Sequence, residues 1–422
     1  MNAAIALGLV AAALLGLPLF VVLAAVGLVA SWRSGVDPAV LIVEMHGLTA
    51  SASLVAIPLF TLVGSVLAAG GAPQRLVRVF NAVLGWMPGG LAVVALTSCA
   101  FFTAFSGVSG VTILALGGLL YPILTAGHYP ERFSLGLVTS SGSLGILFMP
   151  SLPLLLYGVV AKVGIDQLFK AGIIPGLILM VLLGGYSIFT GRRLEVPRQP
   201  FSWAELRIAA RAGVWDLLLP AGIVAGIFGG YVTVTEAASC AAAYVLFVEV
   251  VVHRTLKFDR HLFATFREAV VLVGSILIIL GVSMGLTNLL VNAQIPSRML
   301  AYVGHVVHSP VEFLLLLNGL LLLVGCMMDV FSAIVVVVPL ILPLALRFGV
   351  DPVHLGIIFL ANLEIGYNTP PVGLNLFIAS QRFDKPVFVL FRATLPFLAL
   401  MLLWLAVVTY LPFASLWWRG IF

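Results

Sequence analysis

The sequence predicts an all-α, polytopic membrane protein, and three observations support this fold class. Of its 422 residues, 62% are hydrophobic and only 9% are charged, and the mean hydropathy is +1.20. Apolar runs of about twenty residues, the length that spans a bilayer as a helix, recur along the chain. The alternating pattern of a membrane β-barrel strand is absent from them. This balance excludes a soluble domain. The net charge of +5 then reflects basic loops, not a nucleic-acid surface.

Residues 1–90 are expected to form N-terminal scaffold helices. The nearly uncharged segment 2–31 lacks the basic start of a signal peptide, so it predicts a retained membrane helix that ends near Trp32. A second apolar helix is expected over about 48–69. The segment 74–86, which carries Arg75 and Arg78, reads as an amphipathic piece that lies on the membrane surface.

Residues 91–190 form a first unit in which apolar pieces are short and interrupted. Serine, glycine and proline break the pattern at 105–110, at 139–143 and at 148–153. Pieces shorter than a bilayer span suggest re-entrant hairpins or discontinuous helices. An ordinary spanning helix is expected over about 171–189.

Residues 191–310 contain the most polar part of the chain. Two basic loops, 191–211 and 253–267, flank two apolar pieces at about 216–229 and 237–252. The positive-inside rule puts both loops in the cytoplasm. A further spanning helix is expected over about 269–290, and 300–308 reads as a short interfacial segment.

Residues 311–385 repeat the interrupted pattern, and 386–422 supply a last helix over about 388–411 and an interfacial anchor at Trp417. The segment 362–375 is the most unusual, because Pro370 and Pro371 sit among three asparagines, a threonine and a glutamate in an apolar run. Proline frees backbone carbonyls, which in a membrane must be buried or line a wet cavity. This predicts a broken helix that binds a small cation.

The two interrupted units resemble each other. Gly136 and Pro150 in the first have the same separation as Gly356 and Pro370 in the second, and each unit has a polar break upstream. Paired broken segments indicate a transporter built from inverted repeats, with its site where the repeats meet.

Two acidic residues each allow a structural and a functional interpretation. Asp329 stands between apolar runs, either as a cation ligand or proton carrier or as a helix-end cap. Glu236 follows Thr233 by three residues, which fits a capping box as well as a role in ion coupling.

Glu364 could be a protonatable carboxyl or the partner of a basic group. Oxygen donors cluster around the breaks, and oxygen-only sets suit hard cations such as Na⁺. Serines in membrane helices also promote close packing, which is the structural alternative. These donors are Asn362, Asn368 and Thr369 in the second unit, and Ser106, Ser109, Ser140, Ser141 and Ser143 in the first.

Other chemistries find no support in the sequence. Cys99, Cys240 and Cys326 lie in apolar segments without paired spacing and read as packing residues. The histidines have no metal-ligand spacing, and nucleotide-binding and hydrolase motifs are missing. No cofactor is therefore expected, and the driving force must be an ion gradient. A membrane-embedded enzyme acting on lipids remains a distant alternative, since no catalytic constellation is found.

Several motifs, in order, resemble the large membrane subunit of tripartite ATP-independent periplasmic (TRAP) transporters, within the wider ion-transporter superfamily. The segment 362–375 resembles the family's Thr-Pro-Pro-Val-Gly signature, and 105–110 resembles its first hairpin tip. Further matches are 149–158 with its Pro-Ser-Ile-Pro…Tyr-Gly run, 235–237 with its Thr-Glu-Ala segment and 325–329 with its Gly-x-x-x-Asp. Val108 and Met149 depart from the pattern, and Glu364 and Asn368 are more polar than is usual.

The resemblance implies an elevator-type carrier with a scaffold, a mobile domain and two helical hairpins, the second with its tip at 362–375. It implies Na⁺-coupled uptake of a small organic anion, usually a carboxylate, across the bacterial inner membrane. The implied partners are a small four-helix membrane subunit and a periplasmic substrate-binding protein. A self-sufficient Na⁺- or H⁺-coupled anion carrier of the same superfamily is the alternative.

Position by position, the resemblance also implies two sets of ligands. The substrate is expected between the hairpin tips, and Glu236 and Glu364 are expected in structural or coupling roles. The implied Na⁺ ligands are Ser106, Ser109, Asp329, Asn362, Gly366 and Thr369, and the implied substrate contacts are Ser109, Ser141, Pro150, Asn368 and Pro370.

Overall fold

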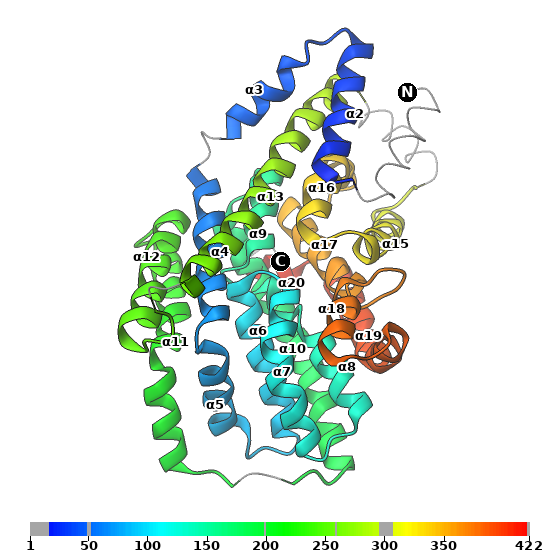
Figure 1. The fold of residues 1–422 in the computed structure, drawn as a ribbon. Helices are drawn as coiled ribbons and strands as arrows, with labels where there is room; N and C mark the ends of the chain where they lie inside the picture. The colour runs from blue at the N-terminus through cyan, green and yellow to red at the C-terminus, as the bar shows by residue number, and fades with distance from the viewer. Residues whose placement is uncertain (1–16, 49–51, 198–199, 258–259, 295–306, 420–422) are drawn as a thin grey trace.

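The structure is a computed structural model that describes residues 17–48, 52–197, 200–257, 260–294 and 307–419. Within these ranges every regular element is a helix (Figure 1). Among the described residues, eight helices are long and apolar enough to cross a membrane, or up to ten if two sharply bent helix pairs each count as one span. The prediction of an all-α polytopic membrane protein is therefore confirmed.

The N-terminal part contains a sharp bend between two apolar helices. Its helices are α2 (Leu19–Ser34), α3 (Ala39–Leu48), α4 (Ala56–Ala69) and α5 (Ala72–Leu84). Gly70 and Gly71 separate α4 from α5, which are bent by 75°. α5 is amphipathic, as predicted for 74–86, because Leu76 and Val79 face the core while Arg78 is exposed. α4 begins at Ala56, later than the predicted start at about residue 48. The part of the predicted helix 2–31 that precedes residue 17 lies outside the described residues.

The first interrupted unit consists of a helix pair followed by a broken helix. Its elements are α6 (Gly90–Ser106), α7 (Ser109–Ala126), α8 (Glu131–Ser141), the 3-10 turn η2 (Leu144–Leu147) and α9 (Leu152–Ala161). Gly107 adopts φ 65°, a left-handed conformation that suits glycine, and so allows the tight turn from α6 to α7. α6, α7 and α8 pack side by side (Figure 1). Both breaks fall where the sequence predicts them.

The middle of the chain provides long spanning helices. These are α10 (Ile165–Arg193), α11 (Trp203–Phe228), α12 (Val234–Phe247) with its π-helical end η3 (Val248–Val252), and α13 (Arg260–Asn292). α13 runs alongside α2, α3 and α4 (Figure 1).

The predicted basic loops are mostly helical, which corrects their boundaries. α11 begins about thirteen residues before the predicted apolar piece because Ser202 caps it, accepting a hydrogen bond from the backbone N–H of Glu205 at 3.3 Å. Arg207 and Arg211 extend from the exposed side of the same helix. The predicted interfacial segment 300–308 lies largely outside the described residues.

The second interrupted unit has the same order of elements as the first. It contains α15 (Pro310–Met327), α16 (Val330–Arg347), α17 (Pro352–Gly366) and α18 (Leu374–Phe383), and it is followed by α19 (Val387–Tyr410), α20 (Phe413–Leu416) and η4 (Trp417–Arg419). The prediction that 362–375 breaks a helix is confirmed. The expectation that it forms a hairpin tip is wrong, because α17 and α18, on either side of it, do not pack against each other as the two arms of a hairpin would. The proline-rich stretch instead separates two consecutive helices.

Candidate functional site

The turn of the first helix pair packs against the break of the first broken helix. Thr103 Oγ1 on α6 lies 2.8 Å from Thr112 Oγ1 on α7 and 2.8 Å from the carbonyl oxygen of Gly142 in the break. Ser106 ends α6 and Ser109 begins α7, and both are buried. The turn and the break therefore form one polar unit inside an apolar core.

The second unit repeats this arrangement with different contacts. The carbonyl oxygen of Cys326, at the end of α15, accepts hydrogen bonds from the backbone N–H groups of Val372 and Gly373, at 3.2 and 3.1 Å. Gly366 lies directly against the backbone of Gly325 and Cys326, so a Cβ atom there would collide with it. Thr369 Oγ1 donates to the carbonyl oxygen of Ile365 at 2.9 Å.

The two breaks meet in the interior. Asn375, at the start of α18, donates a hydrogen bond from Nδ2 to Ser143 Oγ in the first break, at 3.4 Å. Gly110, just after the first turn, lies against the side chain of Ile378 on α18. The fold thus brings together two segments that are more than two hundred residues apart in the sequence.

Buried oxygens without hydrogen-bond partners concentrate around these breaks. Buried polar atoms in folded proteins are nearly always paired, so each exception calls for a ligand, a water or an ion. The structure contains only protein atoms. Within the described residues, the unpartnered atoms of this region are Ser109 Oγ, Ser140 Oγ, Asn362 Oδ1, Asn368 Oδ1, Asn375 Oδ1 and both carboxyl oxygens of Glu364. Such an oxygen-only set has the chemistry of a hard-cation site.

Asp329 caps the start of α16, as the structural interpretation of this residue predicted. Oδ1 accepts hydrogen bonds from the backbone N–H groups of Phe331 and Ser332, both at 3.0 Å, and Oδ2 lies 2.5 Å from Ser332 Oγ. Within the described part of the chain, no hydrogen bond links Asp329 to Ser106 or Ser109. Its proposed role as an ion ligand together with these serines stays a prediction.

Glu236 completes a capping box at the start of α12. Its Oε2 accepts from the backbone N–H of Thr233 at 2.8 Å, and Thr233 Oγ1 accepts from the backbone N–H of Glu236 at 3.3 Å. The spacing predicted this device, and the exposed position of Glu236 matches a structural role.

The residues predicted to contact substrate differ in their surroundings. Ser141 and Asn368 are buried, and their side chains donate to the carbonyl oxygens of Val138 (3.3 Å) and Glu364 (3.1 Å). Pro150 is buried in the first break and Pro370 is exposed in the second. Both belong to cis peptide bonds, Met149–Pro150 and Pro370–Pro371.

A buried chain of polar side chains starts at Asn362 and was not predicted from the sequence. Its Nδ2 donates to Asn318 Oδ1 on α15 at 2.7 Å, and Asn318 Nδ2 donates to Thr409 Oγ1 on α19 at 3.2 Å. The ring of His354 continues the chain to the carbonyl oxygen of Thr409 (3.2 Å) and to Ser415 Oγ (2.6 Å). The one signal in the sequence that could have indicated this chain is the presence of single polar residues within apolar helices.

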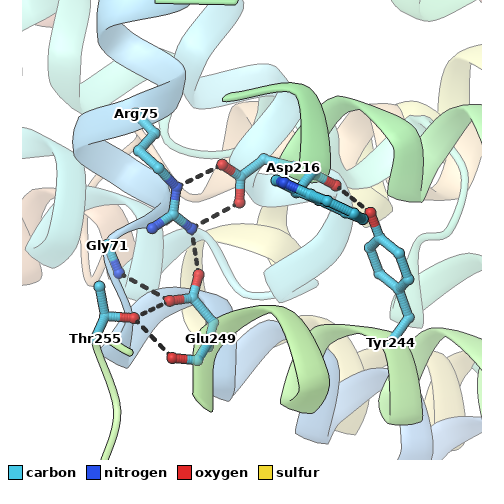
Figure 2. Close-up of polar contacts among 7 residues, drawn as sticks. Gly71, Arg75, Asp216, Tyr244, Glu249 and Thr255 are labelled. Carbon is cyan, nitrogen blue, oxygen red and sulfur yellow. Dashed lines mark hydrogen bonds and ion pairs between the residues drawn. The ribbon is translucent and has the colours of Figure 1, made fainter. Parts of the chain in front are cut away.

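A buried charge cluster at the start of α5 was also missed. Arg75 Nε and Nη2 donate to the Asp216 carboxylate on α11 at 2.6 and 2.8 Å, and Nη2 also contacts Glu249 at the end of α12 (Figure 2). Glu249 further contacts the Thr255 hydroxyl and the backbone N–H of Gly71. This cluster, named here the Arg75 cluster, fastens α5 to α11 and α12.

Comparisons with known proteins match the whole length of this architecture. The model of the family described as "Tripartite ATP-independent periplasmic transporter, DctM component" matches residues 6–414. The chain belongs to this family, so it is a large permease component of a TRAP transporter and not an enzyme.

Among its relatives, the C4-dicarboxylate TRAP transporter large permease protein of Pseudomonas aeruginosa is 37% identical over 365 residues, covering 86% of this chain and 85% of the relative. The ectoine/5-hydroxyectoine TRAP transporter large permease protein of Ruegeria pomeroyi is 30% identical and covers 100% of this chain and 99% of the relative. A crystal structure of the Alcanivorax borkumensis YdaH transporter shares the fold, with a TM-score of 0.61 and 16% identity over 90% of this chain and 88% of that one.

Proposed function

We propose that this permease couples the inward movement of Na⁺ to the uptake of a small organic anion, most simply a carboxylate. The proposal depends chiefly on one observation, the set of buried, unpartnered oxygens where the two breaks meet. Bound Na⁺ would replace the missing hydrogen-bond partners of Asn362 and Ser109 with ion–oxygen contacts. The buried breaks also supply peptide carbonyls, which are suitable Na⁺ ligands.

The proposed movement is that of an elevator. The two interrupted units, α6–α9 and α15–α18, have the same order of elements and meet through Asn375 and Ser143. They would move together as inverted repeats, carrying the ions and the substrate past a scaffold formed by the other helices. The fold shared with the YdaH transporter supports the helical framework of this proposal.

The proposed substrate class follows from the relatives and from the charges of the breaks. Relatives are named for C4-dicarboxylates, isethionate and ectoine. The segments 105–110, 139–153 and 362–375 contain no Lys or Arg. Anion binding would therefore depend on hydroxyl, amide and backbone N–H groups, with Na⁺ supplying positive charge nearby.

The proposed assembly contains a small membrane subunit and a periplasmic substrate-binding protein, in a bacterial inner membrane. The family description names a tripartite periplasmic transporter. A relative from Oleidesulfovibrio alaskensis, the isethionate TRAP transporter permease protein DctMQ, is 34% identical over 87% of this chain, and this chain covers 58% of that relative. Its greater length is consistent with a second permease component fused to the first.

The decisive experiment is uptake into proteoliposomes that contain the permease with its small subunit. Labelled C4-dicarboxylate, isethionate, ectoine and sialic acid are tested with and without the binding protein, under an inward gradient of Na⁺ or of K⁺. We expect uptake of one compound that requires both Na⁺ and the binding protein. Equal uptake in K⁺ would refute sodium coupling, and equal uptake without the binding protein would favour a self-sufficient carrier.

A further inference from the structure

A cavity of about 380 Å³ lies between the two interrupted units and the long helix α13. Its walls come from the end of α9 in the first unit, from α16 in the second unit and from the last part of α13. α16 packs against both of the other helices (Figure 1). Sites for small molecules are typically cavities of about 300–1,000 Å³ with apolar walls and a few polar groups. The volume of this cavity therefore suits a compound of the size of a short organic acid.

Polar side chains of α13 line one wall of the cavity, and Val335 and Pro339 of α16 line the wall opposite. Ser283 Oγ donates to the carbonyl oxygen of Val335 at 2.7 Å, so the two walls are fastened to each other. Thr287 lies one turn further along the same face of α13. Within the described residues, its hydroxyl has no hydrogen-bond partner. This hydroxyl is therefore available to a ligand.

Lys162 supplies a positive charge at this cavity. It ends α9, where its backbone N–H donates to the carbonyl oxygen of Gly158, and the residue is exposed. Among the described residues, its ammonium group forms no salt bridge. Lys162 also lines a second cavity of about 560 Å³, together with Asp166 and residues 233–235. It therefore borders both cavities with a charge that no described carboxylate pairs.

The distribution of basic residues places the cavity on the periplasmic side. Positively charged segments mark the cytoplasmic face of a membrane protein. α10 is long enough to cross a membrane and ends at Arg192 and Arg193, so its start, just after Lys162, lies on the opposite face. α13 begins within the basic segment 253–267, and Thr287 lies near its other end. Lys162 and Thr287 thus meet on the face from which a solute would arrive.

A lysine at this position complements the uncharged breaks. The segments 105–110, 139–153 and 362–375 contain no Lys or Arg. An anion that leaves water for apolar surroundings loses its hydration, and a nearby cation offsets part of that cost and raises the local concentration of anions. The ammonium group is a compact point charge with three donors, so it does not demand one ligand geometry. It suits a carboxylate or a sulfonate group equally.

We propose that this cavity is an entry site for a small organic anion. The Lys162 ammonium binds the carboxylate or sulfonate group of the solute, and the Thr287 hydroxyl donates a hydrogen bond to the same group. This inference rests on the proposed uptake of an organic anion, and it adds a periplasmic site that lies outside the breaks. The solute is held there before it passes to the breaks.

Protection of an introduced thiol tests the inference in the purified full-length permease with its small subunit. Cys99, Cys240 and Cys326 are replaced by Ala, and Val291→Cys places a thiol at the exposed edge of the cavity. Its labelling by a maleimide is followed at constant ionic strength with increasing succinate, isethionate or sialic acid. We expect at least one of these anions to slow the labelling in a saturable manner.

Substitutions at Lys162 then show whether its charge holds the anion. Lys162→Gln should raise the anion concentration for half-maximal protection about tenfold, which corresponds to about 1.4 kcal/mol and is the size expected for one contact to a charged group. Lys162→Arg keeps the charge and should keep the protection. Lys170→Gln is the matched control and should change nothing, because the Lys170 ammonium lies over the ring of Phe228, 5.7 Å from its centre.

A thiol that no anion protects, or equal protection in Lys162→Gln, would overturn the inference. The melting temperature of each variant shows that it is folded, and uptake of the same compounds into proteoliposomes is measured in parallel. Uptake of a compound that gives no protection would remove the entry site and leave the proposed function standing. Protection that depends on Lys162, without uptake of any compound, would keep the anion site and remove the proposed function.

Discussion

At the scale of single residues, Asp329 has a demonstrable structural role and a proposed ionic one, and two substitutions separate them. Asn caps a helix about as well as Asp but carries no charge. We expect Asp329→Asn to keep the melting temperature and to raise the Na⁺ concentration for half-maximal uptake. Asp329→Ala should lose the ionic role and also about 1 kcal/mol of stability from the lost cap.

The measurements are the melting temperature in detergent and the Na⁺ dependence of uptake in proteoliposomes. Unchanged Na⁺ dependence in Asp329→Asn would leave only the capping role. Thr369→Ala is a companion variant, because Thr369 is also a proposed Na⁺ ligand and its hydroxyl lies in the second break, where it donates to the carbonyl oxygen of Ile365. We expect it to impair uptake while expression stays normal.

The structural roles of single residues were predictable only where neighbouring residues in the sequence indicate them. The capping box at Glu236 could be read from a three-residue spacing, and the serines near Gly107 from a polar break in an apolar run. The contact between Asn318 and Asn362 joins residues 44 apart, and the Arg75 cluster joins residues 141 and 174 apart. Only the packing of helices determines such pairs, and one sequence does not contain that information.

At the scale of elements, the close approach of α17 to α15 predicts a strict requirement for glycine. A methyl group at Gly366 would overlap the backbone of Gly325 and Cys326. We expect Gly366→Ala to cost about 1–3 kcal/mol through overpacking and to abolish uptake. Gly319→Ala is the matched control, because Gly319 lies on α15 with open space around its Cα. Equal melting temperatures for the two variants would contradict this packing.

The Arg75 cluster makes a second prediction at this scale. Removing Arg75 leaves the buried carboxylates of Asp216 and Glu249 without their cation, since their side chains are 2% and 0% exposed. Loss of one partner of a buried ion pair costs about 3–5 kcal/mol, so Arg75→Ala should lower the melting temperature strongly. Arg78→Ala should leave it unchanged, because the Arg78–Glu205 pair is about half exposed. Similar shifts in both variants would argue against the cluster as an anchor.

Element boundaries show where apolar runs are a good guide and where they are not. The apolar cores of α10, α13 and α19 were predicted, but α10 continues into polar sequence by several residues at both ends, and α13 does so at its start. Caps such as Ser202, and alternation of exposed and buried faces, extend a helix beyond its apolar part. A hydropathy pattern shows which part of a helix is apolar, but it does not show where the helix begins and ends.

At the scale of the whole molecule, the elevator proposal predicts alternating access to the breaks. Ser109→Cys and Thr369→Cys are made in a background where Cys99, Cys240 and Cys326 are replaced by Ala. We expect each new thiol to react with a membrane-impermeant reagent from one side of the membrane at a time, in a manner that depends on Na⁺. Thiols that never react from either side would contradict a water-accessible site between the breaks.

The architecture was largely predictable at this scale, and its one error is instructive. Composition and long apolar runs indicated the fold class, and two interrupted units with prolines and glycines in the same order indicated the location of the breaks. The stretch 362–375 was expected to be a hairpin tip because proline and glycine mark any sharp interruption. They do not distinguish a reversal of the chain from a break between consecutive helices, and the break between α15 and α16, at Met328 and Asp329, is marked by neither residue.

The breaks meet through one long side-chain hydrogen bond, between Asn375 and Ser143, and neither break contains a fixed positive charge. In the proposed mechanism, cargo that enters between the breaks would therefore meet no fixed positive charge. If the proposed periplasmic protein delivers the cargo, that protein would then set most of the selectivity. On this proposal, the component to exchange when transport of a new solute is wanted is the binding protein and not the permease.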